Sequence, residues 1–443
     1  MVYIPNTDKD REEMFKVIGV KNFEELISNI PQSLRVKGDL NLPPVLSEYE
    51  VIKHLRELSN KNQTVTTHPN YIGGGAYDHI VPVLVDHVLS RSEFYTAYTP
   101  YQPEVSQGTL QVMYEFQTCV SMLAGLDIAN ASMYDGASAL AEAVLMATNI
   151  NNKNKILISK TVHPHHAAVV KTYVQGLDID INEIKEAEGI TDLNDLKSKL
   201  TDDISAVVIQ QPNFLGNLEE VDEINKLIHQ HPNVEFIVTY NPLSVGLLNS
   251  PGSYGADIAV ADGQPLGISL SMGGPYIGLF ATKLSNIRKM PGRMSGQTLD
   301  TKGQICYVLT LQTREQHIKR EKATSNICTN QGLMALAVLT YLTYMGKEGL
   351  AEVATQNYNK AHYLADKISA IPGFKLKYKG DFFNEFVVET SKDVDLILDN
   401  LMKHQIFGGL NLKKFGFDGL MIAVTEKRTK EELDQYAEVL RKL

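Results

Sequence analysis

The chain has 443 residues, of which 43% are hydrophobic and 21% are charged, and its net charge at pH 7 is −10. This acidic balance argues against binding to nucleic acid or anionic membranes, and no apolar run approaches the roughly 18 residues that a membrane span needs. The three widely spaced cysteines form neither a metal-binding pattern nor a disulfide framework, which indicates a reducing, cytoplasmic location.

The first 75 residues are predicted to form an N-terminal arm of short helices. Amphipathic stretches occupy residues 10–18 and 23–27, and Ser47 can cap a third helix with Glu50 at the capping-box position. Such a segment has little core of its own, so we expect it to lie on the rest of the molecule or on a partner.

A glycine run at residues 73–75 precedes a predicted helix over residues 78–89. The run does not follow a strand and lacks the third glycine of the dinucleotide-binding fingerprint. We therefore interpret it as a tight loop that allows another group to approach the backbone closely.

The segment from Ser92 to Gly108 is predicted to be a stiff loop rich in rings and hydroxyls. Tyr95, Tyr98 and Tyr101 recur at every third residue, and the prolines among them exclude both a regular helix and a central strand. Ordered loops often carry functional residues. By composition alone, a structural loop whose tyrosines cover the edge of a core is an equal alternative.

Residues 76–312 are predicted to form a large α/β domain. An apolar helix face runs from Leu110 to Leu123 and ends at Gly125. Beyond it, unbroken apolar runs alternate with helical patterns, which predicts a mostly parallel sheet covered on both faces. The strand candidates are residues 155–159, 206–210, 235–239, 257–261 and 276–280, and helices at 166–174 and 221–229 separate several of them.

The rest of the chain is predicted to contain a connecting helix at residues 313–345 and a small α+β domain at residues 346–443. The small domain has a helical pattern at 349–369, strand candidates at 386–388 and 420–424, and further helices at 392–403 and 429–441. Many α/β enzymes share such an order of elements, so the order alone does not identify a function.

Two stretches near predicted strand ends have competing interpretations. Asp135 precedes a helical run at 137–147, and a self-capped helix is favoured over a phosphate site because its carboxylate would occupy the free amides. His163, His165 and His166 are close in sequence, but Pro164 and the missing second ligand cluster argue against a metal site.

Two further polar stretches lie beyond the predicted sheet. The run from Arg314 to Gln331 is unusually polar for the start of a central helix, and a solvated, ion-paired helix end would explain it. A basic patch at residues 288–296, which includes Arg293, either faces an acidic partner or forms a solvated loop, and the loop is the favoured interpretation.

The string Tyr98-Thr-Pro-Tyr-Gln-Pro-Glu104 closely resembles a motif of the P-proteins of the glycine cleavage system, which are pyridoxal-phosphate (PLP) glycine decarboxylases. The resemblance covers essentially the whole chain. It implies an aminotransferase-like large domain (PLP-dependent transferase fold type I) with a mostly parallel sheet, followed by a small α+β C-terminal domain.

PLP enzymes hold the cofactor aldehyde on a lysine and keep the pyridine nitrogen protonated with an acid. By resemblance to the catalytic half of P-proteins, the lysine position falls on Gln264, ahead of the glycine-rich loop at 272–275, and the acid position falls on Asn241. Neither amide can perform its expected role. Lys283 is the nearest later lysine, but it follows the next predicted strand and is wrongly placed.

The family's two-subunit form pairs a catalytic chain, subunit 2, that carries the PLP lysine with a companion chain, subunit 1, that lacks it. This sequence resembles the companion. The resemblance implies that the partner binds PLP covalently, that this chain does not, and that an α2β2 complex decarboxylates glycine and passes the aminomethyl group to lipoyl H-protein.

The same resemblance implies roles for particular residues. Tyr95, Tyr98 and Glu104 are candidates for orienting glycine or moving protons. The candidate cofactor contacts are Thr324 and Asn326, which would reach the partner's PLP phosphate, and His163, which matches the position of a ring that stacks on the pyridine. Two alternatives remain: an inert subunit that acts as a scaffold or docks H-protein, and a self-sufficient PLP enzyme that uses Lys283.

Overall fold

A computed structural model describes residues 6–38 and 40–443, and the chain divides into two compact units, residues 1–63 and 64–443. Residues 64–75, which were assigned to the arm, thus belong to the second unit. The long helix α12 (Gly332–Ser369) crosses the boundary proposed at residue 345, with Gly346 in a non-helical conformation. The four-part domain division stays a prediction.

The first unit is a series of short helices that bury none of their side chains. Its elements are α1 (Asp8–Ile18), α2 (Phe23–Leu26), the 3-10 turn η1 (Gln32–Leu34) and α3 (Glu48–Ser59). Ser47 caps α3, and Glu50 completes the capping box as predicted. Large apolar side chains such as Val17, Tyr49 and Leu55 are 88%, 76% and 57% exposed. The described residues of this unit therefore form no core of their own.

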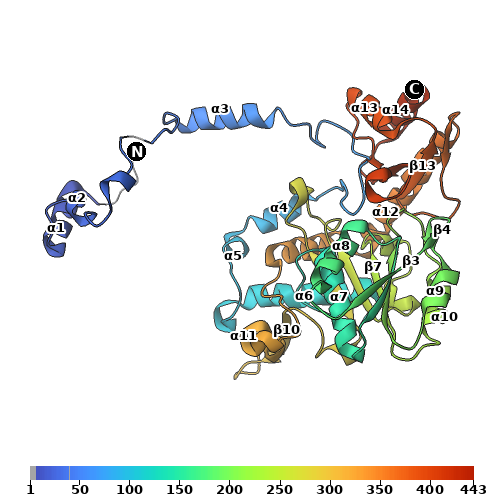
Figure 1. Cartoon of the computed structure of the whole chain (residues 1–443), viewed down its shortest axis with the longest axis horizontal. Coiled ribbons are helices and arrows are strands. Elements are labelled where there is room, and N and C mark those ends of the chain that lie inside the picture. The colour runs from blue at the N-terminus through green and yellow to red at the C-terminus, as the bar shows by residue number, and fades with distance from the viewer. Residues whose placement is uncertain (1–5, 39) are drawn as a thin grey trace. The chain divides into compact units, whose positions relative to one another are not determined.

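The second unit is built on one sheet in which most strands are parallel (Figure 1). In order across the sheet, the strands are β1 (Ile128–Ala129), β9 (Gly278–Thr282), β8 (Ile258–Asp262), β7 (Glu235–Tyr240), β6 (Ile204–Gln211), β2 (Lys155–Ser159) and β3 (Asp180–Ile184). Neighbours from β8 to β3 are parallel, whereas β9 pairs antiparallel with β8 and β1. The predicted fold class is confirmed.

Helices cover both faces of this sheet. On one face, α7 (Gly136–Asn151) and α8 (Pro164–Val174) pack against strand side chains such as Ile158 and Val208. The other face carries α4 (Val83–Leu89), α6 (Gln107–Ala124), α9 (Leu193–Lys199), α10 (Val221–Ile228) and the first part of α12. Successive strand residues point to opposite faces, so strands covered on both sides need the unbroken apolar runs that the sequence shows.

Local chemistry sets the helix ends as predicted. Asp135 caps α7, and its carboxylate accepts a hydrogen bond from the amide of Ser138 while the Ser138 hydroxyl bonds back to the cap. Gly125 ends α6 in the left-handed conformation, with φ at 67°.

A second, antiparallel sheet forms the C-terminal part, coloured red in Figure 1. Its strands are β12 (Phe374–Leu376), β13 (Glu385–Thr390), β15 (Leu420–Ala423) and β14 (Leu410–Asn411), in that order. The end of α12, α13 (Val394–Lys403) and α14 (Lys430–Arg441) pack on it around buried side chains such as Phe386, Ile422 and Tyr436. The predicted small α+β part is thus present, and its edge strands β12 and β14 were missed.

Two predicted helices are wrong in part. Helix α4 begins at Val83 rather than at residue 78, because Pro82 excludes its predecessor from helical backbone and residues 78–80 bond elsewhere. Residues 313–331 form only the short turns η7 (Gln312–Arg314), α11 (Gln316–Lys319) and η8 (Arg320–Lys322), followed by irregular chain. This polar run offers no continuous apolar face to pack.

The hairpin of β10 (Met294–Leu299) and β11 (Ile305–Thr310) was also missed, although the apolar run at residues 305–309 was a visible signal for its second strand. The predicted solvated loop is wrong for Arg293, which is only 2% exposed and lies just before β10. Among residues 6–38 and 40–443, no helix combines the length and the apolar character that crossing a membrane requires.

Candidate functional site

A small cavity, here called the strand-end cavity, lies where β6, β7 and β8 end. Its volume is about 40 Å³. It is lined by Gly75, Tyr77, His163, His166, Gln210, Pro212, Gly216, Thr239, Tyr240, Asn241, Pro242, Asp262, Pro265, Asn384 and Glu385. The carboxyl ends of parallel strands are the usual place for a ligand in an open α/β sheet. The structure therefore brings the predicted His163 and Asn241 together at this position.

Gln264, at the expected lysine position, is 1% exposed and makes only internal contacts. Its side-chain nitrogen donates to the carbonyl oxygens of Tyr77 and Ile268 at 3.0 and 2.8 Å, and its oxygen accepts from the amide of Tyr77 at 2.9 Å. The side-chain amide thus bonds both the N–H and the carbonyl oxygen of Tyr77, as the backbone of a neighbouring strand would. Asn241 also acts locally, because its side-chain oxygen accepts from the amide of Leu243.

His163 is held by the glycine run rather than left open to a cofactor ring. Its Nε2 donates to the carbonyl oxygen of Gly74 at 2.7 Å, and its Nδ1 accepts from the amide of His165 at 3.1 Å. The ring stacks on His166 at 4.7 Å, and a Cβ on Gly75 would lie 3.3 Å from the His163 ring. Burial lowers the pKa of His163 to about 4, so the ring is neutral near pH 7.

Glu385, at the start of β13, closes the other side of the cavity. Its carboxylate accepts from the amide of Gly74 at 2.7 Å and from the hydroxyl of Tyr77 at 2.6 Å. Burial raises the pKa of Glu385 to about 7. A Cβ on Gly73 would lie 2.1 Å from the Glu385 carboxylate, which explains why this close approach uses glycine.

Two carboxylates occupy the helix end at which a phosphate would bind. Asp135 takes the amide of Ser138 at 2.7 Å, and Asp262 takes the amide of Gly136 at 3.0 Å. Burial raises the pKa of Asp262 to about 7. A phosphate here would have to displace two acids from the amides that could hold it.

These residues do not fit a bound PLP. Small-molecule sites usually enclose about 300–1,000 Å³, whereas the strand-end cavity encloses about 40 Å³. Gln264, at the expected lysine position, is an amide and does not line the cavity. Lys283 does not line the cavity, and its ammonium pairs with Asp257 at the far end of β8 from Asp262. In the part of the chain that the structure describes, no group of three His, Cys, Asp or Glu side chains could hold a metal ion.

A second hollow, here called the tyrosine pocket, has a volume of about 190 Å³. Its wall includes α5 (Ser92–Tyr95) and the loop that follows it. The lining residues are Phe94, Tyr95, Ala97, Tyr98, Thr99, Pro100, Thr109, Val112, Met113, Thr329, Asn330, Gly332, Leu333 and Leu336. Tyr95 and Tyr98 are 68% and 89% exposed, so their rings and hydroxyls are accessible from outside.

Arg293 lies next to the tyrosine pocket and connects the tyrosine loop with the segment that precedes α12. Its guanidinium donates to the Tyr101 hydroxyl at 3.0 Å, to the Cys328 carbonyl oxygen at 2.7 Å and to the Thr329 hydroxyl at 3.1 Å. It also lies over the Tyr101 ring, 5.3 Å from the centroid, with the Glu315 carboxylate 3.9 Å away. One buried side chain thereby fixes the loop against the segment before α12.

The other predicted site residues lie outside both hollows. Glu104 is exposed in the turn η2 (Pro103–Val105). Thr324 is half-buried and Asn326 is exposed. Neither of them lines the tyrosine pocket, where Thr329 and Asn330 from the same polar run stand instead. The roles predicted for these residues stay predictions.

Sequence reasoning missed Tyr77, Asp262 and Glu385, three polar residues that line the strand-end cavity. The partners Tyr77 and Glu385 are 308 residues apart, and nothing local marks either of them. Asp262 offered a weak signal, because it stands two residues before the amide at the lysine position.

Comparison with known proteins agrees with this fold. A model of the family described as "Glycine cleavage system P-protein" matches residues 1–440. Two relatives described as "Probable glycine dehydrogenase (decarboxylating) subunit 1" come from Chlorobium luteolum and Bacillus cereus. The first is 50% identical, covering 100% of both chains, and the second is 49% identical, covering 98% of this chain and 97% of the relative.

Solved structures extend the comparison. A crystal structure of glycine decarboxylase (P-protein) of the glycine cleavage system, in inhibitor-bound form, is 40% identical and covers 100% of both chains with a TM-score of 0.91. A sphingosine-1-phosphate lyase from Burkholderia pseudomallei is 14% identical, covers 91% of this chain and 92% of its own, and has a TM-score of 0.67. The second likeness concerns the fold alone.

Proposed function

Because this chain belongs to the glycine cleavage system P-protein family, we propose that it is the companion subunit of a glycine decarboxylase and works with a partner subunit that carries the PLP lysine. PLP on the partner supplies an electron sink for the loss of CO2 from glycine, and the aminomethyl group passes to lipoyl H-protein. This chain has no turnover alone.

The observation that carries this proposal is the state of Gln264. The resemblance puts Gln264 at the position of the PLP lysine, and the polar atoms of this buried amide are bonded to Tyr77 and Ile268. Without a lysine here the chain cannot hold the cofactor aldehyde at this position, so glycine decarboxylation needs a lysine supplied by another chain. The 40 Å³ volume of the strand-end cavity supports the same conclusion.

In the complex, the tyrosine pocket forms one wall of the partner's active site. The phenol hydroxyls of Tyr95 and Tyr98 can both donate and accept hydrogen bonds, so they can orient glycine or hold a proton. Glu104, exposed on the same loop, is a further candidate for moving a proton. Thr329 and Asn330, which line the pocket, join Thr324 and Asn326 as candidates for contacting the partner's phosphate.

The test is a visible absorbance spectrum after addition of PLP, first with this chain alone and then with a partner subunit that carries the lysine. We expect no protein-bound PLP band from the chain alone. With the partner and H-protein present, we expect a band together with glycine–bicarbonate exchange. A band from the chain alone would favour the self-sufficient enzyme that uses Lys283, and borohydride reduction followed by peptide mapping would locate the modified lysine.

A Tyr95→Phe, Tyr98→Phe and Thr324→Ala series in the reconstituted complex distinguishes the proposed wall from an inert scaffold. If these residues form a wall of the active site, the complex should lose exchange activity when their hydroxyls are removed. If the chain is a scaffold or an H-protein docking subunit, the complex should tolerate all three changes. Unchanged turnover in the whole series would therefore replace the shared-site proposal with the scaffold.

A further inference from the structure

The segment Gly73–Ile80 lines the strand-end cavity through Gly75 and Tyr77 and is hydrogen-bonded from both sides. From the large sheet, His163 donates to the carbonyl oxygen of Gly74, and Gln264 bonds both the amide and the carbonyl of Tyr77. From the C-terminal part, Glu385 accepts from Gly74 and from the Tyr77 hydroxyl. The Tyr77 side chain is 7% exposed and lies in the wall of the cavity.

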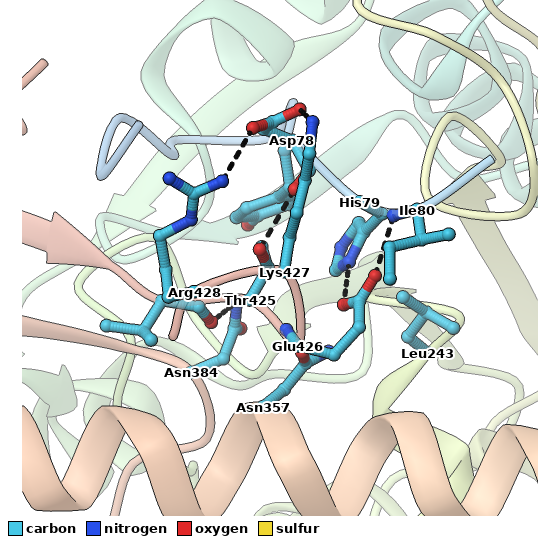
Figure 2. A network of polar contacts seen from close by, with 12 residues as sticks. Asp78, His79, Ile80, Leu243, Asn357, Asn384, Thr425, Glu426, Lys427 and Arg428 are labelled. Carbon is cyan, nitrogen blue, oxygen red and sulfur yellow. Dashed lines mark hydrogen bonds and ion pairs between the residues drawn. The ribbon is translucent and has the colours of Figure 1, made fainter. Parts of the chain in front are cut away.

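The next three residues are fixed by the turn that follows β15. Figure 2 shows Asp78 between Lys427 and Arg428, with carboxylate oxygens 2.7 and 3.2 Å from their nitrogens. The Thr425 hydroxyl donates to the carbonyl oxygen of Asp78 at 2.9 Å. These contacts are buried, since the Asp78 and Arg428 side chains are 6% and 3% exposed.

Glu426 fixes the end of the segment. Its two carboxylate oxygens contact His79 Nδ1 and the amide of Ile80, each at 2.7 Å (Figure 2). The amide of Glu426 itself donates to Asn357 of α12. The segment is thereby tied to the central sheet, to the C-terminal sheet and to the long helix between them.

We propose that Gly73–Ile80 is a built-in plug that occupies the place of the cofactor in this chain and braces its two sheets together, so that a lysine at position 264 is not enough to restore PLP binding. The inference goes beyond the proposed function, because it concerns how this chain rejects the cofactor, whatever its role in the complex. The plug provides hydrogen-bond partners for the polar side chains around the cavity. Gly74 bonds to His163, Tyr77 bonds to Gln264, and both Gly74 and Tyr77 bond to Glu385.

The first experiment is Gln264→Lys in the full chain, incubated with PLP, reduced with borohydride and mapped by peptide mass. Gln230→Lys adds a lysine at an exposed position and sets the background of non-specific labelling. We expect labelling at residue 264 no higher than at residue 230. If residue 264 carried several times as much pyridoxyl label as residue 230 in the control variant, the plug proposal would be wrong.

A second measurement on the unaltered chain keeps the proposal testable if Gln264→Lys does not fold. Hydrogen exchange of the amides of Gly74, Tyr77 and Ile80 reports whether the segment opens. We expect these amides to exchange at least about 100-fold more slowly than amides of exposed loops, because each donates to a buried acceptor. Exchange at the rate of an exposed loop would show a mobile segment and remove the plug. Neither measurement involves decarboxylation, so failure of the plug and failure of the proposed function are separate results.

Discussion

The strand-end cavity and the tyrosine pocket differ in what their polar groups bond to. At the cavity, the lining residues His163 and Glu385 and the nearby Gln264 are buried and bonded within the chain. In the pocket, Tyr95 and Tyr98 face outward and only the supporting Arg293 is buried. The contrast teaches that one fold can use the polar groups of one region for internal structure while it leaves the hydroxyls of another region open to its surroundings. Changes at the cavity should therefore alter stability, and changes at the pocket should alter activity.

The largest expected effect is on stability, from Asp78→Ala. Removing this carboxylate leaves the 3% exposed Arg428 without its closest ion-pair partner. Breaking a buried pair in this way costs about 4 kcal/mol of unfolding free energy. Urea unfolding of the purified chain measures the loss. Asp203→Ala, which removes an exposed ion pair with Lys155, is the matched control and should change little. Equal losses in the two variants would contradict the bracing role of Asp78.

Tyr98→Phe should have the next largest effect. It should lower the activity of the complex and leave the stability of the chain unchanged. Loss of a hydroxyl that orients glycine or holds a proton is expected to lower exchange by about 10- to 100-fold in the reconstituted complex. The unfolding curve should not move, because the side chain is 89% exposed. Tyr344→Phe, 59% exposed on α12, removes a hydroxyl outside the pocket and should leave exchange unchanged. Equal exchange in both variants would count against the pocket as part of the active site.

The third prediction concerns how the unfolding free energy changes with pH through Glu385, which lines the strand-end cavity. Burial raises the pKa of this carboxyl from its ordinary value of 4.5 to about 7, so the folded chain holds a proton that the unfolded chain releases. The stability from that proton is present below pH 4.5 and is lost as the pH rises towards 7. Compared with Glu385→Gln, the unaltered chain should therefore lose unfolding free energy across this window.

Other titratable groups near Glu385 also change stability with pH, so the titration needs Glu385→Gln as its control. Burial raises the pKa of Asp262 to about 7, which acts in the same direction, and lowers the pKa of His163 and His166 to about 4 and 3, which acts in the opposite direction. All three are present in both proteins, so they cancel from the difference between the unaltered chain and Glu385→Gln. A difference that stays constant from pH 4.5 to 7 would contradict a raised pKa at Glu385.

The smallest expected effect comes from Tyr101→Phe. Tyr101 belongs to the tyrosine loop, but its hydroxyl is bonded to the buried Arg293. The ring remains, but the buried guanidinium of Arg293 loses one acceptor. Leaving this donor unpaired should lower the unfolding free energy by about 1 kcal/mol. Thermal unfolding with Tyr344→Phe as the reference measures it. No shift would mean that Arg293 does not hold the tyrosine loop.

Local chemistry made parts of this fold predictable. Asp135 and Ser138 stand three residues apart, and so do Ser47 and Glu50, so short-range patterns were enough to place the starts of α7 and α3. The apolar runs of the central strands were equally visible, because both faces of each strand are covered. The resemblance to a family then supplied His163, Asn241 and Gln264, which lie on or next to one cavity.

Long-range contacts could not be predicted in this way. The edge strand β3 mixes polar and apolar residues and lacks a continuous apolar run, so its pairing with β2 was not visible. Strand β10 is largely polar, whereas β11 carries an apolar run at residues 305–309 that was overlooked. The bond between Tyr77 and Glu385 exists only because the folded sheets bring two distant segments together. For the same reason, residues 324 and 326 were named as candidates and residues 329 and 330 were not considered, since only the folded chain shows which part of the polar run lines the pocket.

Cys328 gives the molecule a native reporter of assembly. It is exposed, whereas Cys119 and Cys306 are partly covered and burial raises the pKa of Cys119, so a thiol-specific dye should label position 328 first. Its carbonyl is held by Arg293, and the residue that follows it lines the tyrosine pocket. The rate at which this thiol is modified can therefore be followed as a partner is titrated in, and protection of a single sulfur would register when that face is covered.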